Sequence, residues 1–322
     1  MLDRLIGAPA KAVEGNGHSA DASGLILSVN DLATKKITAW QAVQLARDQK
    51  RPHALDIIER VFDRFQELHG DRGFRDDPAI VTGIGELDGR PVVVVGQQKG
   101  SSTEENIERN FGMPFPEGYR KAMRMYRLAA KFHLPLVTLV DTPGAYPGPE
   151  AEERGQAEAI AKSIETMTTL PTPIVAIILG EGGSGGALAL GVGDVVLAMQ
   201  NAIYSVISPE GAAAILFRSA GEAERAANAL RLSAPELLSM GIVDGLIPEP
   251  EGGAHLDHDA TGRNIKAALV AQLDRLARVP VGDLLTNRYE RFRAIGSIVE
   301  PALDGSPPKA EPWWKRALRI RP

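Results

Sequence analysis

The spacing of hydrophobic positions changes along the chain and separates stretches of different expected structure. Apolar residues recur at helical spacing over residues 39–47 and again over 54–69, as they do in amphipathic helices. Residues 91–96 form a continuous apolar run rich in valine, which is typical of a strand buried on both faces. The pattern therefore predicts a helical arm over 37–69, followed by a buried sheet.

Helical and strand patterns alternate through the middle of the chain. The predicted helices cover 118–132, 150–167, 187–190, 264–278 and 289–298, and the predicted strands cover 136–140, 174–179 and 195–199. Buried strands that alternate with helices indicate an α/β core built in layers. Ser208 before Pro209 predicts the start of one further helix, with serine as the N-cap and proline at the first helical position.

The two ends of the chain differ from the middle. Residues 1–36 are mostly small or polar and lack a clear period, so we expect a flexible leader there. The main domain is expected over 37–290, with its core at about 70–250, and the proline-rich segment 291–322 is expected to be a loose tail. Trp313 and Trp314 in that tail are interpreted as local packing, and docking on a partner is the alternative.

Glycine is clustered in two segments that each follow a predicted central strand. The chain has 33 glycines in 322 residues, more than the usual share of about 7%, and they gather at 141–148 and 180–186. A helix N-terminus free of covering side chains favours an anion. Two such turns side by side suit a reaction that develops charge on oxygen. The simpler interpretation is that these glycines only allow tight turns and close packing.

The segment 180–186 fits several short motifs, none of which is specific by itself. The dinucleotide-binding pattern lacks the acidic residue expected near position 200, and no lysine completes a phosphate-binding loop. The pattern also fits a nucleophile elbow centred on Ser184, with His255 or His258 available later in the chain. A serine hydrolase therefore remains an open alternative at this point.

Composition removes several other classes of protein. The chain has no cysteine, which excludes disulfides, iron–sulfur clusters, cysteine-ligated zinc and a catalytic thiol. Its 36 basic and 41 acidic residues give a net charge of −5, so nothing draws the whole chain to nucleic acid or acidic membranes. No apolar run reaches the roughly 18 residues of a spanning helix, and no signal peptide is apparent. We therefore expect a cytoplasmic protein without a membrane anchor.

Several ordered blocks of the sequence are similar to one family. The blocks are 67–72, 99–100, 110–114, 116–121, 141–148, 180–186 and 204–211. Together they resemble the carboxyltransferase alpha subunits of multi-subunit bacterial acetyl-CoA carboxylase. The segment 232–244 also resembles the wider crotonase superfamily, which implies an α/β fold with a spiral of β-β-α turns.

The resemblance implies an activity and a set of partners. Carboxybiotin on a biotin carboxyl carrier protein, charged by a biotin carboxylase, would give its carboxyl group to acetyl-CoA, and malonyl-CoA would enter fatty acid biosynthesis. A separate beta subunit with a zinc ribbon would hold the coenzyme A thioester, in an expected α2β2 assembly. This chain would carry no metal, and released biotin could itself act as the base.

The resemblance also assigns residues to the site. The backbone N–H groups of Gly185 and Gly186 would form an oxyanion hole for the ureido oxygen of biotin, and such donors are typically worth about 10²–10³ in rate. The other residues assigned to biotin binding are Gly144, Ala145, Gly182 and Gly183.

The chain departs from the family pattern in one loop. Where the family is expected to have His-Gln-Lys-Gly-Arg, this chain has Gln97 at the first position and Ser101 at the last. The resemblance therefore does not supply a basic contact at these two positions. Lys99 and Arg120 are considered as contacts for a nucleotide phosphate or an acidic carrier surface, although basic residues near loops are usually only solvated.

Two interpretations remain, one for the segment around His69 and one for the chain as a whole. His69, Asp71 and Arg72 are expected to form a structural knot of ion pairs and hydrogen bonds at the end of a helix rather than a catalytic group. A non-catalytic scaffold that uses the crotonase fold only to bind a partner is the second alternative, beside the hydrolase.

Overall fold

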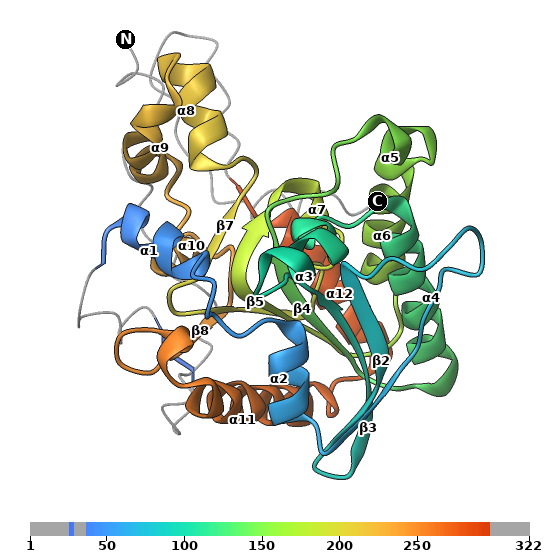
Figure 1. The fold of residues 1–322 in the computed structure, drawn as a ribbon. Coiled ribbons are helices and arrows are strands. Elements are labelled where there is room, and N and C mark those ends of the chain that lie inside the picture. Colours follow the sequence, from blue (N-terminus) through green and yellow to red (C-terminus); the bar gives the residue numbers. More distant parts are fainter. Residues whose placement is uncertain (1–25, 29–36, 297–322) are drawn as a thin grey trace, which may run out of the picture.

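The computed structural model describes residues 26–28 and 37–296, and a mixed sheet lies at the centre of this part of the chain (Figure 1). The strands lie in the order β1-β2-β3-β4-β5-β6-β8, and β7 pairs with β5. The strands are β1 (Arg64–Glu67), β2 (Ile80–Leu87), β3 (Arg90–Gln97), β4 (Leu136–Thr142), β5 (Ile174–Gly183), β6 (Val195–Met199), β7 (Ile203–Ser205) and β8 (Gly245–Ile247). The first three strands pair antiparallel, whereas every pairing from β3 to β8 is parallel.

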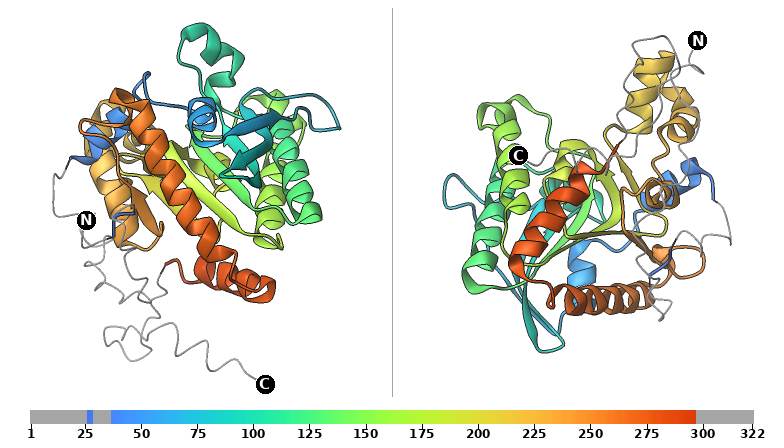
Figure 2. Two further views of the ribbon diagram at one scale, coloured as in Figure 1. Left: turned by 90° about the horizontal axis from the view of Figure 1, so that it is seen from below. Right: turned by 180° about the vertical axis from the view of Figure 1, so that it is seen from behind.

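Helices cover both faces of the sheet. Their bounds are α1 (Ala39–Ala46), α2 (Ala54–Val61), α3 (Thr103–Glu108), α4 (Pro116–Phe132), α5 (Pro149–Glu153), α6 (Gln156–Thr168), α7 (Ser184–Leu188), α8 (Pro209–Phe217), α9 (Ala223–Leu230), α10 (Ala234–Ser239), α11 (His258–Leu276) and α12 (Val281–Arg293). Helices α4 and α6 lie on one side of the sheet, and α2 and α11 lie on the other (Figures 1 and 2). The α8–α9 pair stands away from the sheet (Figure 1). No helix of the described residues is long and apolar enough to cross a membrane.

The alternating pattern of the middle of the chain is confirmed. All seven residues of β4 are buried, as are the first nine of β5, because helices cover both faces of these strands. The capping of α8 is confirmed as well: the Ser208 hydroxyl accepts a hydrogen bond from the Gly211 N–H at 3.1 Å, and Pro209 occupies the first helical position.

The helix predicted over 54–69 is wrong in its second half. Helix α2 ends at Val61, because Phe62 has an extended backbone conformation. The next residues form β1, which pairs antiparallel with β2. The sequence patterns do not predict strand β2. The predicted arm is therefore part of the core, since Ile57 and Ile58 of α2 are buried in the main hydrophobic cluster.

Other predicted helices also have different bounds. The helix expected over 187–190 is α7, which begins at Ser184 and ends at Leu188. The helix expected over 150–167 is broken into α5 and α6, because Gly155 adopts a left-handed conformation (φ 81°) and starts α6. Helix α11 begins at His258 rather than at the predicted residue 264. The Asp257 side chain caps it by accepting a hydrogen bond from the Ala260 N–H at 2.8 Å. The helix expected over 289–298 is α12, which begins at Val281 and ends at Arg293.

Part of the predicted leader belongs to the sheet. Leu27 and Leu246 exchange two backbone hydrogen bonds of 2.8 and 3.2 Å, so residues 26–28 extend the edge at β8. The rest of the leader, 1–25 and 29–36, lies outside the described residues. So does most of the predicted tail, with Trp313 and Trp314.

Candidate active site at two glycine turns

The two glycine segments meet at one edge of the sheet. Strands β4 and β5 are parallel neighbours, so their carboxyl ends lie together, and Thr142 pairs with Gly182 at that edge. The pairing register shifts between Val140 and Thr142. Beyond it, residues 143–148 form the first turn, and the second leads from Gly183 into α7. The expected juxtaposition of two glycine turns is therefore present.

The two turns pack against each other through their backbones. A Cβ atom on Gly183 would lie 2.1 Å from the Pro143 carbonyl oxygen. A Cβ atom on Gly186 would lie 2.4 Å from the Ala145 nitrogen and 2.6 Å from the Gly144 carbonyl carbon. Side chains do not fit at such distances, so close packing accounts for glycine at these two positions.

Two of the other three assigned glycines, Gly144 and Gly185, have more room. A Cβ atom on Gly185 would meet only the Ile160 side chain, at 3.6 Å, which is an ordinary contact. A Cβ atom on Gly144 would have no atom within 4 Å, although Gly144 is buried and has a positive φ of 155°. Open space therefore lies beside the first turn, next to the Ala145 backbone.

A small hollow lies beside the second turn. It is lined by residues of both turns and of β7, among them Pro143, Glu181, Gly182, Gly183 and Ser205, and the space in it that is open to water is only about 10 Å³. Gly182 is backed by the Tyr204 ring, since a Cβ atom there would lie 2.7 Å from the ring carbon Cδ2. The hollow therefore marks the place where both turns and β7 meet, and it has room for about one water molecule.

Thr142 shapes the first turn. Its hydroxyl oxygen accepts a hydrogen bond from the Gly144 N–H at 3.0 Å and lies 2.6 Å from the Gly112 carbonyl oxygen and 2.7 Å from that of Gly144. Threonine at the end of β4 thus closes the turn on itself and also ties it to the loop before α4.

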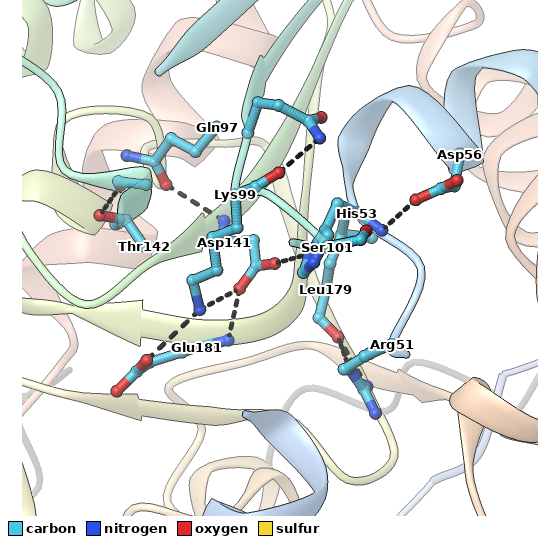
Figure 3. A network of polar contacts seen from close by, with 12 residues as sticks. Arg51, His53, Asp56, Gln97, Lys99, Ser101, Asp141, Thr142, Leu179 and Glu181 are labelled. Atoms are coloured by element: carbon cyan, nitrogen blue, oxygen red, sulfur yellow. Dashed lines mark hydrogen bonds and ion pairs between the residues drawn. The ribbon is translucent and has the colours of Figure 1, made fainter. Parts of the chain in front are cut away.

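A cluster of charged side chains lies beneath both turns (Figure 3). The Lys99 ammonium lies 2.8 Å from Asp141 Oδ1 and 3.3 Å from Glu181 Oε2. His53 Nδ1 lies 3.0 Å from Asp141 Oδ2, and Asp141 Oδ1 also accepts the Glu181 N–H at 3.0 Å. Arg47 joins Glu181 to Glu210 on α8, with distances of 2.6 and 2.8 Å.

The charged partners in this cluster decide the direction in which the pKa values of Asp141 and Lys99 shift. Burial alone would raise the pKa of Asp141, but the charge of Lys99 and the hydrogen bond from His53 outweigh it, so the pKa lies below its usual value. Burial would lower the pKa of Lys99, but the charges of Asp141 and Glu181 outweigh that effect and raise it. Both groups are therefore charged at neutral pH.

The two basic residues considered as anion contacts already have carboxylate partners. Lys99 is 13% exposed and is held by the two carboxylates of the cluster. Arg120 lies 3.2 Å from Asp71 and 3.4 Å from Glu117, and it donates to the Arg154 carbonyl at 3.0 Å. Contact with an external anion stays a prediction for both.

The two departures from the family pattern differ in position. Gln97, the last residue of β3, is fully buried. Ser101 is exposed, and its N–H donates to the Glu105 side chain at 2.8 Å. Only Gln97 lies within hydrogen-bond distance of the glycine turns.

Ser184 lies at the start of α7, exposed and with a positive φ of 55°. The structure gives it no hydrogen bond to any histidine among the described residues. His258 Nε2 lies 2.7 Å from the Lys50 carbonyl instead, and His255 lies beside Gly253. Within the described part of the chain, neither of the two histidines that the nucleophile-elbow hypothesis needs therefore forms a hydrogen bond with Ser184: His258 bonds to Lys50, and the buried Nδ1 of His255 has no hydrogen-bond partner.

The knot expected around His69 is present, although it follows β1 rather than a helix. His69 Nδ1 lies 3.1 Å from Asp76, and Asp71 accepts the N–H groups of Gly73 and Phe74, each at 2.8 Å. Arg72 donates to the His69 carbonyl at 3.1 Å. These contacts order the loop between β1 and β2.

Sequence reasoning missed several members of the charged cluster. His53 and Arg47 lie about 90 and 135 positions from their partners in the sequence, and no short motif links them. The one available signal is Gln97, because a polar side chain directly after a run of buried valines needs a partner in the core.

The described residues contain no group of three or more histidine, aspartate or glutamate side chains that could hold a metal ion.

Comparison with known proteins places the chain in a family. A family model described as acetyl co-enzyme A carboxylase carboxyltransferase-like matches residues 25–296. The acetyl-coenzyme A carboxylase carboxyl transferase subunit alpha of Thermus thermophilus is 58% identical over 267 residues, which cover 83% of this chain and 84% of that protein. The subunit of the same name from Methylococcus capsulatus is 54% identical and covers 83% of each chain.

Solved structures agree in fold. The transcarboxylase 12S structure matches with a TM-score of 0.58 at 24% identity, over 71% of this chain and 42% of that one. The beta subunit of Pseudomonas aeruginosa geranyl-CoA carboxylase matches with a TM-score of 0.54 at 19% identity, over 74% and 46%. The expected crotonase-like fold is confirmed, and the hydrolase and scaffold interpretations gain no support. The chain belongs to the family of acetyl-coenzyme A carboxylase carboxyltransferase alpha subunits.

Proposed function

We propose that this chain is the alpha subunit of an acetyl-CoA carboxyltransferase and that it presents its two glycine turns to carboxybiotin. The proposal rests on family membership, together with one observation: the turns after β4 and β5 pack backbone to backbone at one edge of the sheet. In this proposal the carboxyl group passes to the methyl carbon of acetyl-CoA, giving malonyl-CoA and free biotin.

The backbone donors of the two turns fit the ureido group of a biotin ring. Open space lies beside Gly144, whereas the hollow beside Gly182 and Gly183 would have to widen to admit the ring. Gly185, which is half exposed, and Gly186 would direct N–H groups at the ureido oxygen, with Ala145 on the opposite side. When bound, carboxybiotin would supply the carboxyl group, and its ureido nitrogen, once the carboxyl group has left it, would accept the methyl proton before the new carbon–carbon bond forms.

The chain's own part is to stabilise negative charge on oxygen with fixed dipoles. Backbone N–H groups held rigidly at the reacting oxygen need no reorganisation during the reaction, and each donor is typically worth about 10²–10³ in rate. The cluster of Lys99, Asp141 and Glu181 lies beneath the turns and keeps their ends together. Neither Lys99 nor Glu181 is assigned a proton-transfer role.

The proposed partners follow the family name. A beta subunit would hold the coenzyme A thioester, in an α2β2 assembly, and a biotin carboxyl carrier protein, charged by a biotin carboxylase, would deliver the carboxyl group. The reaction would then take place in the cytoplasm, where these partners act on fatty acid biosynthesis.

We expect activity only in the presence of the beta subunit. The purified chain alone should show negligible malonyl-CoA decarboxylation with free biotin, which is the reverse reaction, and mixing it with a beta subunit should produce it. Gel filtration of the mixture measures assembly. Full activity of the isolated chain would contradict the proposal, as would an assembled complex that is inactive.

The hydrolase alternative is tested at Ser184. If backbone N–H groups stabilise the charge, Ser184→Ala should lower the rate of the assembled complex by less than about tenfold, or about 1.4 kcal/mol. A nucleophilic serine would make the same variant inactive. Steady-state carboxyl transfer by the complex measures the difference.

A further inference from the structure

The side chain of Gln97 joins the two glycine turns from inside the core. Its Oε1 accepts a hydrogen bond from the Asp141 N–H at 3.1 Å, and its Nε2 donates to the Gly186 carbonyl at 2.8 Å. Asp141 belongs to the end of β4, directly before the first turn, and Gly186 belongs to α7 in the second. Figure 3 shows Gln97 reaching the Asp141 backbone. One buried amide therefore contacts both halves of the site.

The sheet itself does not hold the turns together at this level. Pairing between β4 and β5 ends at Thr142 and Gly182 and is already irregular after Val140. Helix α7 is only five residues long and packs on β4, β5 and α6. The Gln97 amide adds a direct hydrogen bond between the α7 backbone and the end of β4. Gln97 lies on the neighbouring strand β3, which pairs regularly with β4 up to Gly96, and it is fully buried.

We propose that Gln97 is a positioning residue that sets the orientation of α7 relative to the first turn, and thereby the aim of the N–H groups of Gly185 and Gly186. This inference rests on the function proposed above. The turns are already as close as backbone allows at Gly186 and Ala145. A small rotation of α7 would therefore move the donors away from the reacting oxygen, and misplacement by about 1 Å can cost about 10²-fold in rate.

The chemistry of the link defines which side chains can replace glutamine. Position 97 must offer one acceptor to the Asp141 N–H and one donor to the Gly186 carbonyl. A neutral imidazole offers one of each, whereas an imidazolium offers two donors. A protonated carboxyl group also offers one of each, whereas a carboxylate offers only acceptors. Methionine offers neither at useful strength.

Several ionisable groups lie near position 97. They are Asp141 on β4, Glu181 on β5, Lys99 in the loop after β3, His53 before α2 and Tyr119 on α4, whose hydroxyl faces Gly186. Asp141 has a lowered pKa, and Lys99 and Tyr119 have raised ones. These three groups therefore keep their charge states between about pH 6 and 8. His53 and Glu181 are present in the parent complex as well, so a pH dependence that a variant shows and the parent does not is assigned to position 97.

The first test compares Gln97→Met with Gln98→Met in the complete complex with the beta subunit. Gln98 is the matched control, because it is also buried and also makes two hydrogen bonds, with the Leu55 N–H and the Lys99 carbonyl, but does not touch either turn. Gln97→Met should lower kcat by about tenfold or more and change the KM for the coenzyme A thioester by less than about threefold. Gln98→Met should leave kcat within about threefold.

The second test uses the pH profile, which a loss of packing alone would not change. Gln97→His should restore activity at pH 8 and lose it as the pH falls towards 6, because protonation removes the acceptor. Gln97→Glu should show the opposite trend, since burial raises the pKa of a carboxyl group and its protonated form supplies the missing donor. The parent complex should show neither of these two pH trends.

The outcomes separate this inference from the function on which it rests. An inactive parent complex would contradict the proposed function. An active parent with a Gln97→Met variant of unchanged kcat, or with parallel pH profiles for the histidine and glutamate variants, would overturn the role of Gln97 alone. If Gln97→Met does not fold, the histidine and glutamate profiles decide.

Discussion

Individual glycines at the site have different physical reasons to be glycine. Gly183 and Gly186 face the backbone of the other turn at distances that exclude a Cβ atom, whereas Gly185 faces only one side chain at an ordinary distance. Gly144 has free space beside it but a positive φ. A motif of several glycines therefore combines positions required by packing with positions that leave room for a ligand.

This difference predicts unequal effects of alanine at neighbouring positions. Gly186→Ala places a Cβ atom 2.4 Å from the Ala145 nitrogen, so the turns must separate, and we expect a loss of about 10² or more in carboxyl transfer. Gly185→Ala keeps its N–H group and meets only Ile160, so we expect less than about a tenfold loss. Steady-state rates of the two complexes and their elution on gel filtration provide the comparison. Equal rates for both variants would contradict the packing argument.

At the scale of elements, ion pairs hold together segments that are far apart in the sequence. Lys99 after β3 contacts Asp141 on β4 and Glu181 on β5, and Arg47 after α1 continues the chain of contacts to Glu210 on α8. The cluster therefore connects five elements around the two turns. Because it is mostly buried, loss of one charge leaves another without its partner.

We expect Lys99→Met to lower the free energy of unfolding by about 3–5 kcal/mol at pH 7, as is typical when a buried ion pair loses one partner. The control is Lys162→Met on α6, whose pair with Glu165 is 57% and 66% exposed, and whose loss should cost about 0.5 kcal/mol or less. Urea unfolding of the purified chains gives both values. Equal midpoints for the parent and Lys99→Met would show that the cluster adds no stability.

The difference in the free energy of unfolding between the parent and Lys99→Met should depend on pH. The pKa of Asp141 is lower in the folded chain than its usual 3.8, so its stabilising contribution is complete above about pH 4 and is lost as the pH falls further. The pKa of Lys99 is raised above 10.5, so its contribution persists throughout the neutral range. The difference in stability between the parent and Lys99→Met should therefore be largest near neutral pH and should narrow below about pH 4.

At the scale of the whole molecule, segments near both ends of the described chain close the core. Residues 26–28 extend the sheet at β8, and α12 is anchored by Arg288, which is almost fully buried. Arg288 lies 2.8 Å from both carboxylate oxygens of Asp194 and donates to the carbonyl oxygens of Met167, Leu170 and Thr172. Residues 26–28 thus extend the sheet at the β8 edge, and Arg288 holds α12 against the core. Both contacts support the sheet that carries the site at the carboxyl ends of β4 and β5.

The local sequence determined much of this protein. The valine run of β3, the alternation from α4 to β6, the cap of α8 and the two glycine turns were all predictable, because each depends on periodicity or turn chemistry within a few residues. The ordered motifs also predicted the family, which the comparisons confirm. The helix over 54–69 was predicted wrongly because β1 is defined by its pairing with β2, which local periodicity does not report.

Only the tertiary structure decided how the site is held. Which glycines face backbone and which face open space depends on how two turns approach each other across the sheet. The partners of Gln97, Asp141 and Glu181 come from segments up to about 135 residues away, and Lys99 has two carboxylate partners in the core. These features arise from packing between elements, because a side chain's partners in the core are set by spatial neighbours and not by neighbours in the chain.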